Sequence, residues 1–247
     1  MRPSLSVVIP VYNEGAAITG WLDRVFAEVR DSTEVLAVFD SPEDTTAPFL
    51  SEYAIREPRL RPVLNTYGRG PARAIRFGID QSEADITVVS MADGSDQPEQ
   101  IEMLADLIRQ GAVVAAASRY MPGGRQIGGP WLKTTLSKAA GLTLHWFAGV
   151  PIHDATSSFK GYSRAFVRNV GIESDEGFEL ALELVAKARR LRLAMAEIPT
   201  TWTDRTTGSS NFKLWKWLPA YLRWYLFAFG PTTTVAKLNE RRKGERE

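Results

Sequence analysis

Short apolar runs alternate with amphipathic stretches along most of the chain. Leu5–Val11 is rich in β-branched residues, as a buried parallel strand would be, and apolar side chains then recur at helical spacing from Ile18 to Val29. The same order returns several times, with further strand-like runs at 34–39, 60–64, 86–89, 112–117 and 194–202. This alternation predicts an α/β fold, a Rossmann-like nucleotide-binding domain with a mostly parallel central sheet.

The stretch 87–99, TVVSMADGSDQPE, contains the strongest candidate for a ligand site. An apolar strand breaks there into an acidic turn with Asp93 and Asp96, and a helical pattern that ends at Gly111 follows. Open α/β sheets bind their ligands at the carboxyl ends of the strands, where a carboxylate can hold a divalent cation against a diphosphate. The alternative for Asp96 is a helix N-cap, with Glu99 three residues later completing a capping box.

Two other predicted strand ends offer polar groups to a ligand. Asp40 follows the second strand, where it can accept hydrogen bonds from a ribose or a base, although an Asp before Ser-Pro also suits a simple turn. Arg69 precedes a helix that opens at Pro71, and such a helix start can attract an anion. No glycine-rich phosphate loop is present, so other groups must neutralise the phosphates of any bound nucleotide.

The pattern changes at residues 212–229, FKLWKWLPAYLRWYLFAF, where eight of eighteen residues are aromatic. At 100° per residue, one face gathers Leu214, Trp217, Leu218, Tyr221, Trp224 and Tyr225. A basic, aromatic, amphipathic segment of this kind favours peripheral contact with a membrane interface. The alternative is a helix docked on the domain with its aromatic side chains buried. Pro219 is expected to kink or split the segment.

Composition and charge narrow the class of protein. The net charge of +1 argues against nucleic-acid binding, and the absence of cysteine excludes disulfides and thiolate metal sites. No apolar run reaches the roughly 18–20 residues of a membrane-spanning helix. Strand-like sequence begins within four residues, so we expect no signal peptide and a cytoplasmic protein peripheral to the membrane. The expected organisation is one domain over 1–211, amphipathic helices over 212–236 and a disordered charged tail over 237–247.

The motifs, taken in order, resemble the inverting family 2 glycosyltransferases over residues 4–225. They are VVIPVYNE, Asp40, MADGSDQPE, SRY at Arg119, HDATSSFKGYSR, GFELALEL and DRTTGSS. Within that family the likeness is greatest to polyprenyl-phosphate sugar transferases of the dolichyl-phosphate mannose synthase type, through the loop around Arg119 and the stretch PWLKTTLSKAAG. The resemblance implies a GT-A fold, a single α/β domain that binds a nucleotide-sugar donor at its strand ends.

The resemblance also implies roles for matching positions. Nucleoside contacts would fall on Pro10, Tyr12, Glu14 and Asp40, and contacts to the acceptor phosphate on Arg119, Lys133 and Ser137. Asp93 matches the second carboxylate of the family's Asp-any-Asp metal motif, but Met91 replaces the first. Mg²⁺ and Mn²⁺ prefer oxygen ligands, so the metal would rest on Asp93 with the diphosphate, or on Asp93 with Asp96, or metal dependence would be weak. Arg205 matches a late arginine that would contact the donor diphosphate.

These roles imply transfer of a hexose from a nucleotide sugar, of the GDP-mannose or UDP-glucose type, to a polyprenyl phosphate at the membrane surface. A phosphate oxygen is already anionic and attacks the anomeric carbon without a general base. Two alternatives remain open. One is a family 2 transferase that uses a hydroxyl acceptor with Asp154 as base, next to a structural His153; the other is a non-catalytic subunit that binds sugar nucleotides, suggested by Met91.

Overall fold

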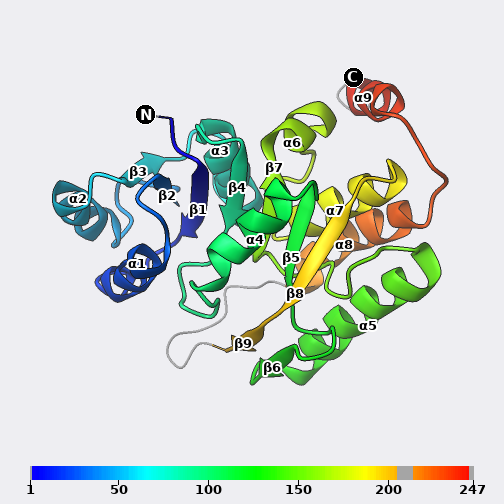
Figure 1. The fold of residues 1–247 in the computed structure, drawn as a ribbon, viewed down its shortest axis with the longest axis horizontal. Coiled ribbons are helices and arrows are strands. Elements are labelled where there is room, and N and C mark those ends of the chain that lie inside the picture. The colour runs from blue at the N-terminus through cyan, green and yellow to red at the C-terminus, as the bar shows by residue number, and fades with distance from the viewer. Residues whose placement is uncertain (1, 205–213, 245–247) are drawn as a thin grey trace.

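A computed structural model describes residues 2–204 and 214–244, without the side chains of 214 and 215 (Figure 1). Its centre is a seven-stranded sheet of order β3-β2-β1-β4-β7-β5-β8. The strands are β1 Leu5–Val11, β2 Thr33–Phe39, β3 Leu60–Leu64, β4 Ile86–Val89, β5 Val114–Ser118, β7 Lys160–Ser163 and β8 Met195–Pro199. Every pairing is parallel except those of β7, which runs antiparallel to both β4 and β5. The predicted mostly parallel α/β sheet is confirmed.

Helices cover both faces of this sheet (Figure 1). They are α1 Ala17–Glu28, α2 Ala47–Arg56, α3 Pro71–Gln81, α4 Gln100–Arg109, α5 Trp131–Ala148, α6 Arg164–Val170, α7 Leu180–Arg190, α8 Leu214–Ala228 and α9 Val235–Gly244. Alternate residues of β1 enter opposite cores, because successive side chains of a strand point to opposite faces. Val7 packs in the core of α1, α2 and α4, and Val8 packs in that of α3, α7 and α8. Both faces are therefore buried, which explains the continuous apolar runs.

The aromatic helix α8 docks on the domain. Trp217 and Trp224 are buried, and Trp224 packs edge-on against Phe227 with 5.3 Å between ring centroids. Pro219 lies inside the helix without splitting it, so the expectation of two short helices is wrong, while the alternative of a kink stays a prediction. A proline removes only one backbone donor, and the helix continues because its aromatic face is held by the core. Within residues 2–204 and 214–244, no helix combines the length and apolar content needed to cross a bilayer.

The expectation of a disordered tail from residue 237 is wrong for its described part, because α9 forms there. Leu238 is buried in the core of α7 and α8. The guanidinium of Arg241 lies over the ring of Phe227, 4.6 Å from its centroid. The side-chain amide of Asn239 also donates to the backbone oxygen of Asn169 on α6. These contacts produce no periodic apolar pattern in the sequence.

Candidate active site

A cavity of about 840 Å³ opens at the carboxyl ends of the parallel strands β1, β2, β4 and β5. The strand order reverses between β1 and β4, which is the point where open α/β sheets bind their ligands. Four of its lining residues follow these strands directly or within a few residues: Tyr12, Asp40, Asp93 and Arg119. Positions spread over more than a hundred residues thus meet at one place.

The turn after β1 is held by the loop after β2. Asn13 adopts a left-handed conformation with φ of 54°, and its backbone N–H donates to Asp44 at 3.0 Å. The hydroxyl oxygen of Thr46 accepts from the backbone N–H of Glu14 at 2.9 Å. These contacts leave the ring of Tyr12 exposed at the cavity rim, while Pro10 and Glu14 also line the cavity. The supporting residues Asp44 and Thr46 were not predicted from the sequence, since they differ in no way from ordinary turn residues.

Asp40 lines the cavity and joins three loops there. Its Oδ1 accepts from the side-chain amide of Asn65, and its Oδ2 accepts from the backbone N–H of Gly70, both at 2.8 Å. This carboxylate therefore fixes the loop that carries Arg69 and opens α3. Each carboxylate oxygen has a second lone pair, so the turn-forming and ligand-binding interpretations of Asp40 are compatible.

Asp96 lines the cavity beside Asp93, and its nearly buried carboxylate contacts the end of β4. Its Oδ2 accepts from the backbone N–H of Met91 at 2.8 Å and from the hydroxyl of Ser90 at 3.1 Å. Burial raises the pKa of Asp96 to about 7, against the effect of these hydrogen bonds. The capping-box alternative is wrong, because α4 has Glu99 at its N-cap and no side-chain cap. Asp96 instead satisfies donors at the end of β4.

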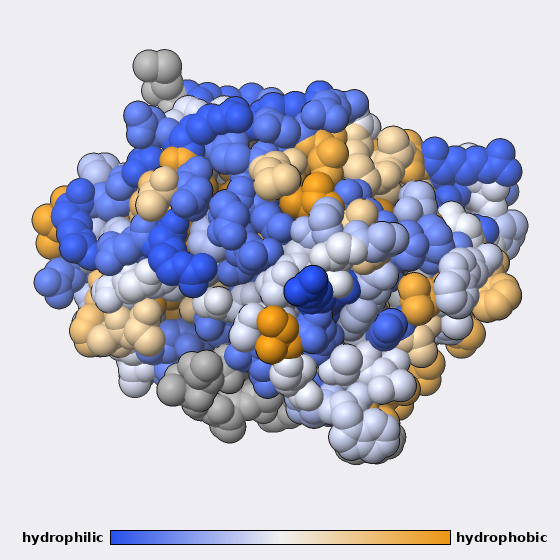
Figure 2. Space-filling model, turned by 60° about the horizontal axis from the view of Figure 1, so that its bottom comes forward, coloured by the Kyte–Doolittle hydropathy of each residue, from blue (hydrophilic) through white to orange (hydrophobic). Residues whose placement is uncertain are grey.

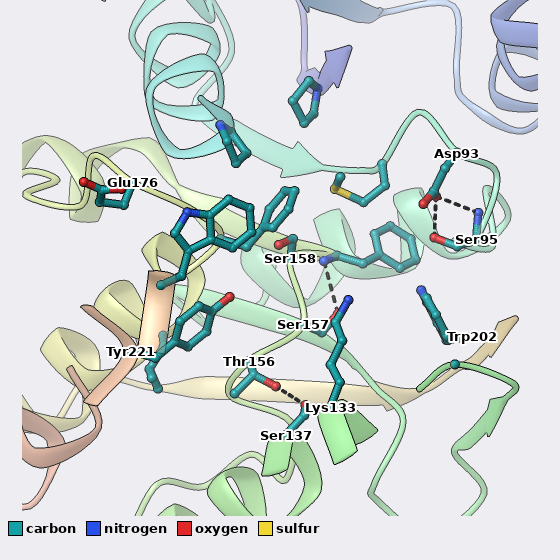
Figure 3. A pocket seen from close by; sticks show the side chains of 18 of the residues that line it. Asp93, Ser95, Lys133, Ser137, Thr156, Ser157, Ser158, Glu176, Trp202 and Tyr221 are labelled. Carbon is teal, nitrogen blue, oxygen red and sulfur yellow. Dashed lines mark hydrogen bonds between the residues drawn. The ribbon is translucent and has the colours of Figure 1, made fainter. Parts of the chain in front are cut away.

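Asp93, in the same turn but before Asp96 in the chain, also lines the cavity. Its Oδ1 accepts from the hydroxyl of Ser95 at 2.6 Å and from the backbone N–H of that residue at 3.1 Å (Figure 3). Within the described part of the chain, no group of three or more His, Cys, Asp or Glu residues could hold a metal ion by itself. Any divalent cation here would need most of its oxygen ligands from a bound diphosphate or from water.

Arg119 and Asp154 form a buried ion pair at the opposite wall. The Nε and Nη2 atoms of Arg119 donate to the two carboxylate oxygens at 2.7 and 3.1 Å. Burial alone would raise the pKa of Asp154, but the adjacent guanidinium outweighs it and lowers this pKa to about 2. The Asp154 carboxylate is fully buried and does not line the cavity. It anchors Arg119, and its position and low pKa make it unsuited to the predicted role of general base.

Helix α5 brings two further predicted residues to Arg119. The hydroxyl of Ser137 accepts from Arg119 Nη2 at 3.1 Å and lies 2.6 Å from the hydroxyl of Thr156. Lys133 lies one helical turn before Ser137, and Figure 3 shows its side chain reaching into the cavity between Asp93 and Tyr221. Gly141 allows this close approach of α5, because a Cβ there would lie 2.2 Å from the backbone oxygen of His153.

Two buried charges beneath the cavity were not predicted. The ammonium of Lys160, on β7, donates to the backbone oxygen of Ser157; burial lowers its pKa to about 8 although Asp154 acts in the opposite direction. The carboxylate of Glu179 accepts from the backbone N–H of Gly177 at 2.7 Å and so shapes the loop that carries Glu176 to the cavity. The polar stretch around Lys160 and the motif GFELALEL indicated importance, but neither pattern indicated that these charges are buried.

Arg205 lies outside the described residues. The chain leads toward it along β9, Thr201–Thr203, which pairs with β6, Arg125–Ile127. Trp202 and Asp204 line the cavity immediately before it. The predicted contact between Arg205 and a donor diphosphate therefore stays a prediction.

The fold and the cavity define a GT-A type α/β domain with an acidic turn facing a basic wall. Residues 6–171 match the family model for glycosyl transferase family 2, and the chain belongs to this family of glycosyltransferases. A polyprenol monophosphomannose synthase of Mycolicibacterium smegmatis is 30% identical over 211 residues, covering 83% of this chain and 79% of the relative. An undecaprenyl-phosphate mannosyltransferase of Micrococcus luteus is 28% identical over 210 residues, covering 83% of this chain and 85% of the relative.

A solved structure shows the same fold. Glucosyl-3-phosphoglycerate synthase of Mycobacterium tuberculosis, in complex with Mn²⁺, UDP and glucosyl-3-phosphoglycerate, superimposes with a TM-score of 0.67 at 18% identity. The match covers 94% of this chain and 82% of the synthase.

Proposed function

We propose that the chain transfers a hexose, with inversion, from a nucleotide sugar to a polyprenyl phosphate. The observation that carries this proposal is the group formed by Arg119, Lys133 and Ser137 on one wall of a cavity whose other wall holds Asp93. Two cationic side chains and a hydroxyl suit a phosphate monoester. The names of the two similar relatives, a polyprenol monophosphomannose synthase and an undecaprenyl-phosphate mannosyltransferase, support the same acceptor class and favour a mannosyl donor.

The proposed reaction requires that the acceptor phosphate and the donor be aligned, and it does not require a side chain to remove a proton from the acceptor. An oxygen of the acceptor phosphate forms a bond to the anomeric carbon while the bond from that carbon to the donor diphosphate breaks. The nucleoside diphosphate leaves with the bonding electron pair. Arg119 and Lys133 hold the acceptor phosphate, and Asp40 and Tyr12 hold the nucleoside, so the reacting atoms are brought into line. The attacking oxygen is already anionic, and no side chain has to remove a proton.

A divalent cation, Mg²⁺ or Mn²⁺, would be held by Asp93 together with the donor diphosphate. It would supply positive charge to the departing nucleoside diphosphate. Mg²⁺ sites of one carboxylate completed by phosphates and water are common, and the single carboxylate of Asp93 fits such a site. The side chain of Met91 contributes no oxygen ligand, and Oδ2 of Asp96 is engaged with Ser90 and the Met91 backbone. We therefore place the metal on Asp93 and not on Asp96.

A hydroxyl acceptor is disfavoured by the surroundings of Asp154. A general base must reach the hydroxyl that it deprotonates, and its pKa should lie near the working pH. Asp154 is enclosed by Arg119, Thr156 and Ser157, with its pKa lowered to about 2. Asp96 is another carboxylate that lines the cavity and acts on the charge of Arg119, but its Oδ2 already accepts hydrogen bonds from Ser90 and from the Met91 backbone.

A screen of donors and acceptors tests this function. Purified protein is incubated with GDP-mannose, UDP-glucose or UDP-GlcNAc, with and without a polyprenyl phosphate, in Mg²⁺, Mn²⁺ or EDTA. Release of nucleoside diphosphate is expected only when a hexose donor, the lipid phosphate and a metal are all present. Release of nucleoside diphosphate that persists in EDTA would show that the transfer does not need a metal. Absence of release from every combination would reject the transfer and favour a non-catalytic binding subunit.

A further inference from the structure

The outer face of α5 is exposed to solvent and yet consists largely of apolar side chains. Trp131, Trp146 and Phe147 are exposed by 76%, 65% and 74%. Leu132 and Leu136 are exposed beside them on the same side of the helix. The opposite side is buried against the domain and contains Gly141, Leu144 and Ala148. A helix with an apolar inner face normally presents a polar outer face to water, and α5 does not.

Helix α8 extends this apolar surface. Its aromatic face is buried, but Leu222 and Leu226 point outward, and Phe229 follows them at the end of the helix. The two helices are in contact, with the hydroxyls of Thr143 and Tyr225 2.9 Å apart. The α5–α8 surface is defined by Trp131, Leu132, Leu136, Trp146, Phe147, Leu222, Leu226 and Phe229. Orange side chains gather along the lower right edge of Figure 2, the side on which Figure 1 places α5.

The sequence segments that contain α5 and α8 carry basic but no acidic residues. Residues 120–153 contain no Asp or Glu, and neither do residues 205–239, although the chain has 29 such residues in total. Lys138 is exposed in the first half of α5, and Arg125 is exposed on β6, a few residues before the helix begins. Two basic side chains of α8 are paired with glutamates, Lys216 with Glu176 and Arg223 with Glu173, so the basic side chains that complement the anionic headgroups of a phospholipid leaflet are those beside α5. A second copy of this chain would offer only the same positive charge to this surface.

We infer that the α5–α8 surface docks on the anionic face of a phospholipid bilayer. The cavity reaches this surface, because Leu136, Thr143, Leu222 and Tyr225 line its wall between the two helices. In this orientation the hydrocarbon chain of an acceptor stays in the bilayer while its phosphate reaches Lys133 and Arg119. This last step rests on the proposed function, but docking on the bilayer does not. The surface differs from the face of α8 that the sequence pattern indicated, where Trp217 and Trp224 are buried and Tyr221 and Tyr225 line the cavity.

Flotation with lipid vesicles tests the docking surface. The full chain is mixed with vesicles of phosphatidylcholine, with or without phosphatidylglycerol, and the bound fraction is measured. The double variant Trp146→Glu, Phe147→Glu is expected to lower partitioning onto the mixed vesicles by at least about tenfold, since two charges enter the apolar face. The matched control is Ile55→Glu on α2, which changes a side chain that is 84% exposed outside the α5–α8 surface. Circular dichroism melting checks that each variant is folded.

Two results would overturn the inference. One is equal vesicle binding by the wild type and the folded double variant. The other is a wild-type dimer, detected by light scattering, that the double variant converts to monomers while vesicle binding stays unchanged; the surface would then bind a second copy.

A second assay separates this inference from the proposed function. Transfer to a short, water-soluble polyprenyl phosphate should be unchanged in the double variant, whereas transfer to a long-chain acceptor in vesicles should fall about tenfold. If the double variant loses transfer activity equally with both acceptors, the two residues do more than dock the protein on the bilayer, which would contradict the inference. If the wild type transfers to neither acceptor, the proposed function fails, and flotation alone decides whether the surface binds a bilayer.

Discussion

Replacing Arg119 by methionine is expected to lower the free energy of unfolding at neutral pH by about 3–5 kcal/mol. The change leaves the fully buried carboxylate of Asp154 without its cationic partner. Thr156 and Ser157 still donate hydrogen bonds to that carboxylate, but neither brings a positive charge. Urea denaturation followed by circular dichroism measures the loss as a lower transition midpoint at an unchanged slope.

The double variant Arg119→Met, Asp154→Asn is the matched control because it removes both charges together. Part of the lost free energy of unfolding is expected to return, because the unpaired carboxylate is gone, although the buried ammonium of Lys160 then loses the nearby negative charge of Asp154. A single variant that stays within about 1 kcal/mol of the wild type, the range of surface ion pairs, would contradict the importance of this pair.

The pH dependence of the same pair has a definite sign. Arg119 lowers the pKa of Asp154 to about 2 in the folded protein, despite burial. A carboxyl group with a lowered folded-state pKa contributes stability above its unfolded pKa, near 4, and loses it as the pH falls through the folded value. The wild type should therefore lose stability between about pH 4 and pH 2 through this group, and the double variant should lack that component.

Replacing Asp93 by asparagine is expected to lower kcat/KM for sugar transfer by about 10²–10³-fold, the effect of several kcal/mol of lost charge stabilisation. Asparagine keeps the size of the side chain and an oxygen that can accept from Ser95. It loses the negative charge that would hold a cation against the donor diphosphate. Initial rates in Mg²⁺ with a saturating polyprenyl phosphate measure the effect.

Asp31→Asn serves as the control for that substitution. Asp31 is an exposed carboxylate that pairs with Arg59 at 3.6 Å just before β2, at the end of the sheet opposite the cavity. Its removal should leave the transfer rate within about twofold of the wild type, as for ordinary surface changes. Equal rates for Asp93→Asn and the wild type would exclude Asp93 from the donor site.

Local patterns were enough to predict the sheet and the place of the site. The spacing of apolar residues along the chain predicts the alternation of strands and helices. The carboxyl ends of parallel strands lie at one edge of the sheet, so the place of the site follows from it. Arg119 and Ser137 were assigned to one phosphate site through the family resemblance, and the structure places them 3.1 Å apart. Asp93 lies in the cavity as expected, whereas its direct partner Ser95 was not anticipated.

Contacts between distant segments could not be predicted in the same way. The ion pair of Arg119 with Asp154 joins residues 35 positions apart, so no local pattern indicates it. The sequence suggested for Asp154 only the role of base in the alternative with a hydroxyl acceptor. The amphipathic pattern of α8 is the same whether its aromatic face meets lipid or a protein core. In the structure Trp224 is buried in the core, and the exposed apolar surface is formed by α5, at Trp146 and Phe147, together with the outer side of α8.

The most direct measurement compares two acceptors that differ only at their polar end, a polyprenyl phosphate and the polyprenol of the same chain length. Both are presented in vesicles with the hexose donor that the screen identifies, and the products are analysed by mass spectrometry. A hexose attached to the phosphate alone, with inverted anomeric configuration, is the result that the site geometry predicts. Transfer to the alcohol, or a retained configuration on the phosphate, would contradict base-free attack by a phosphate held between Arg119 and Lys133.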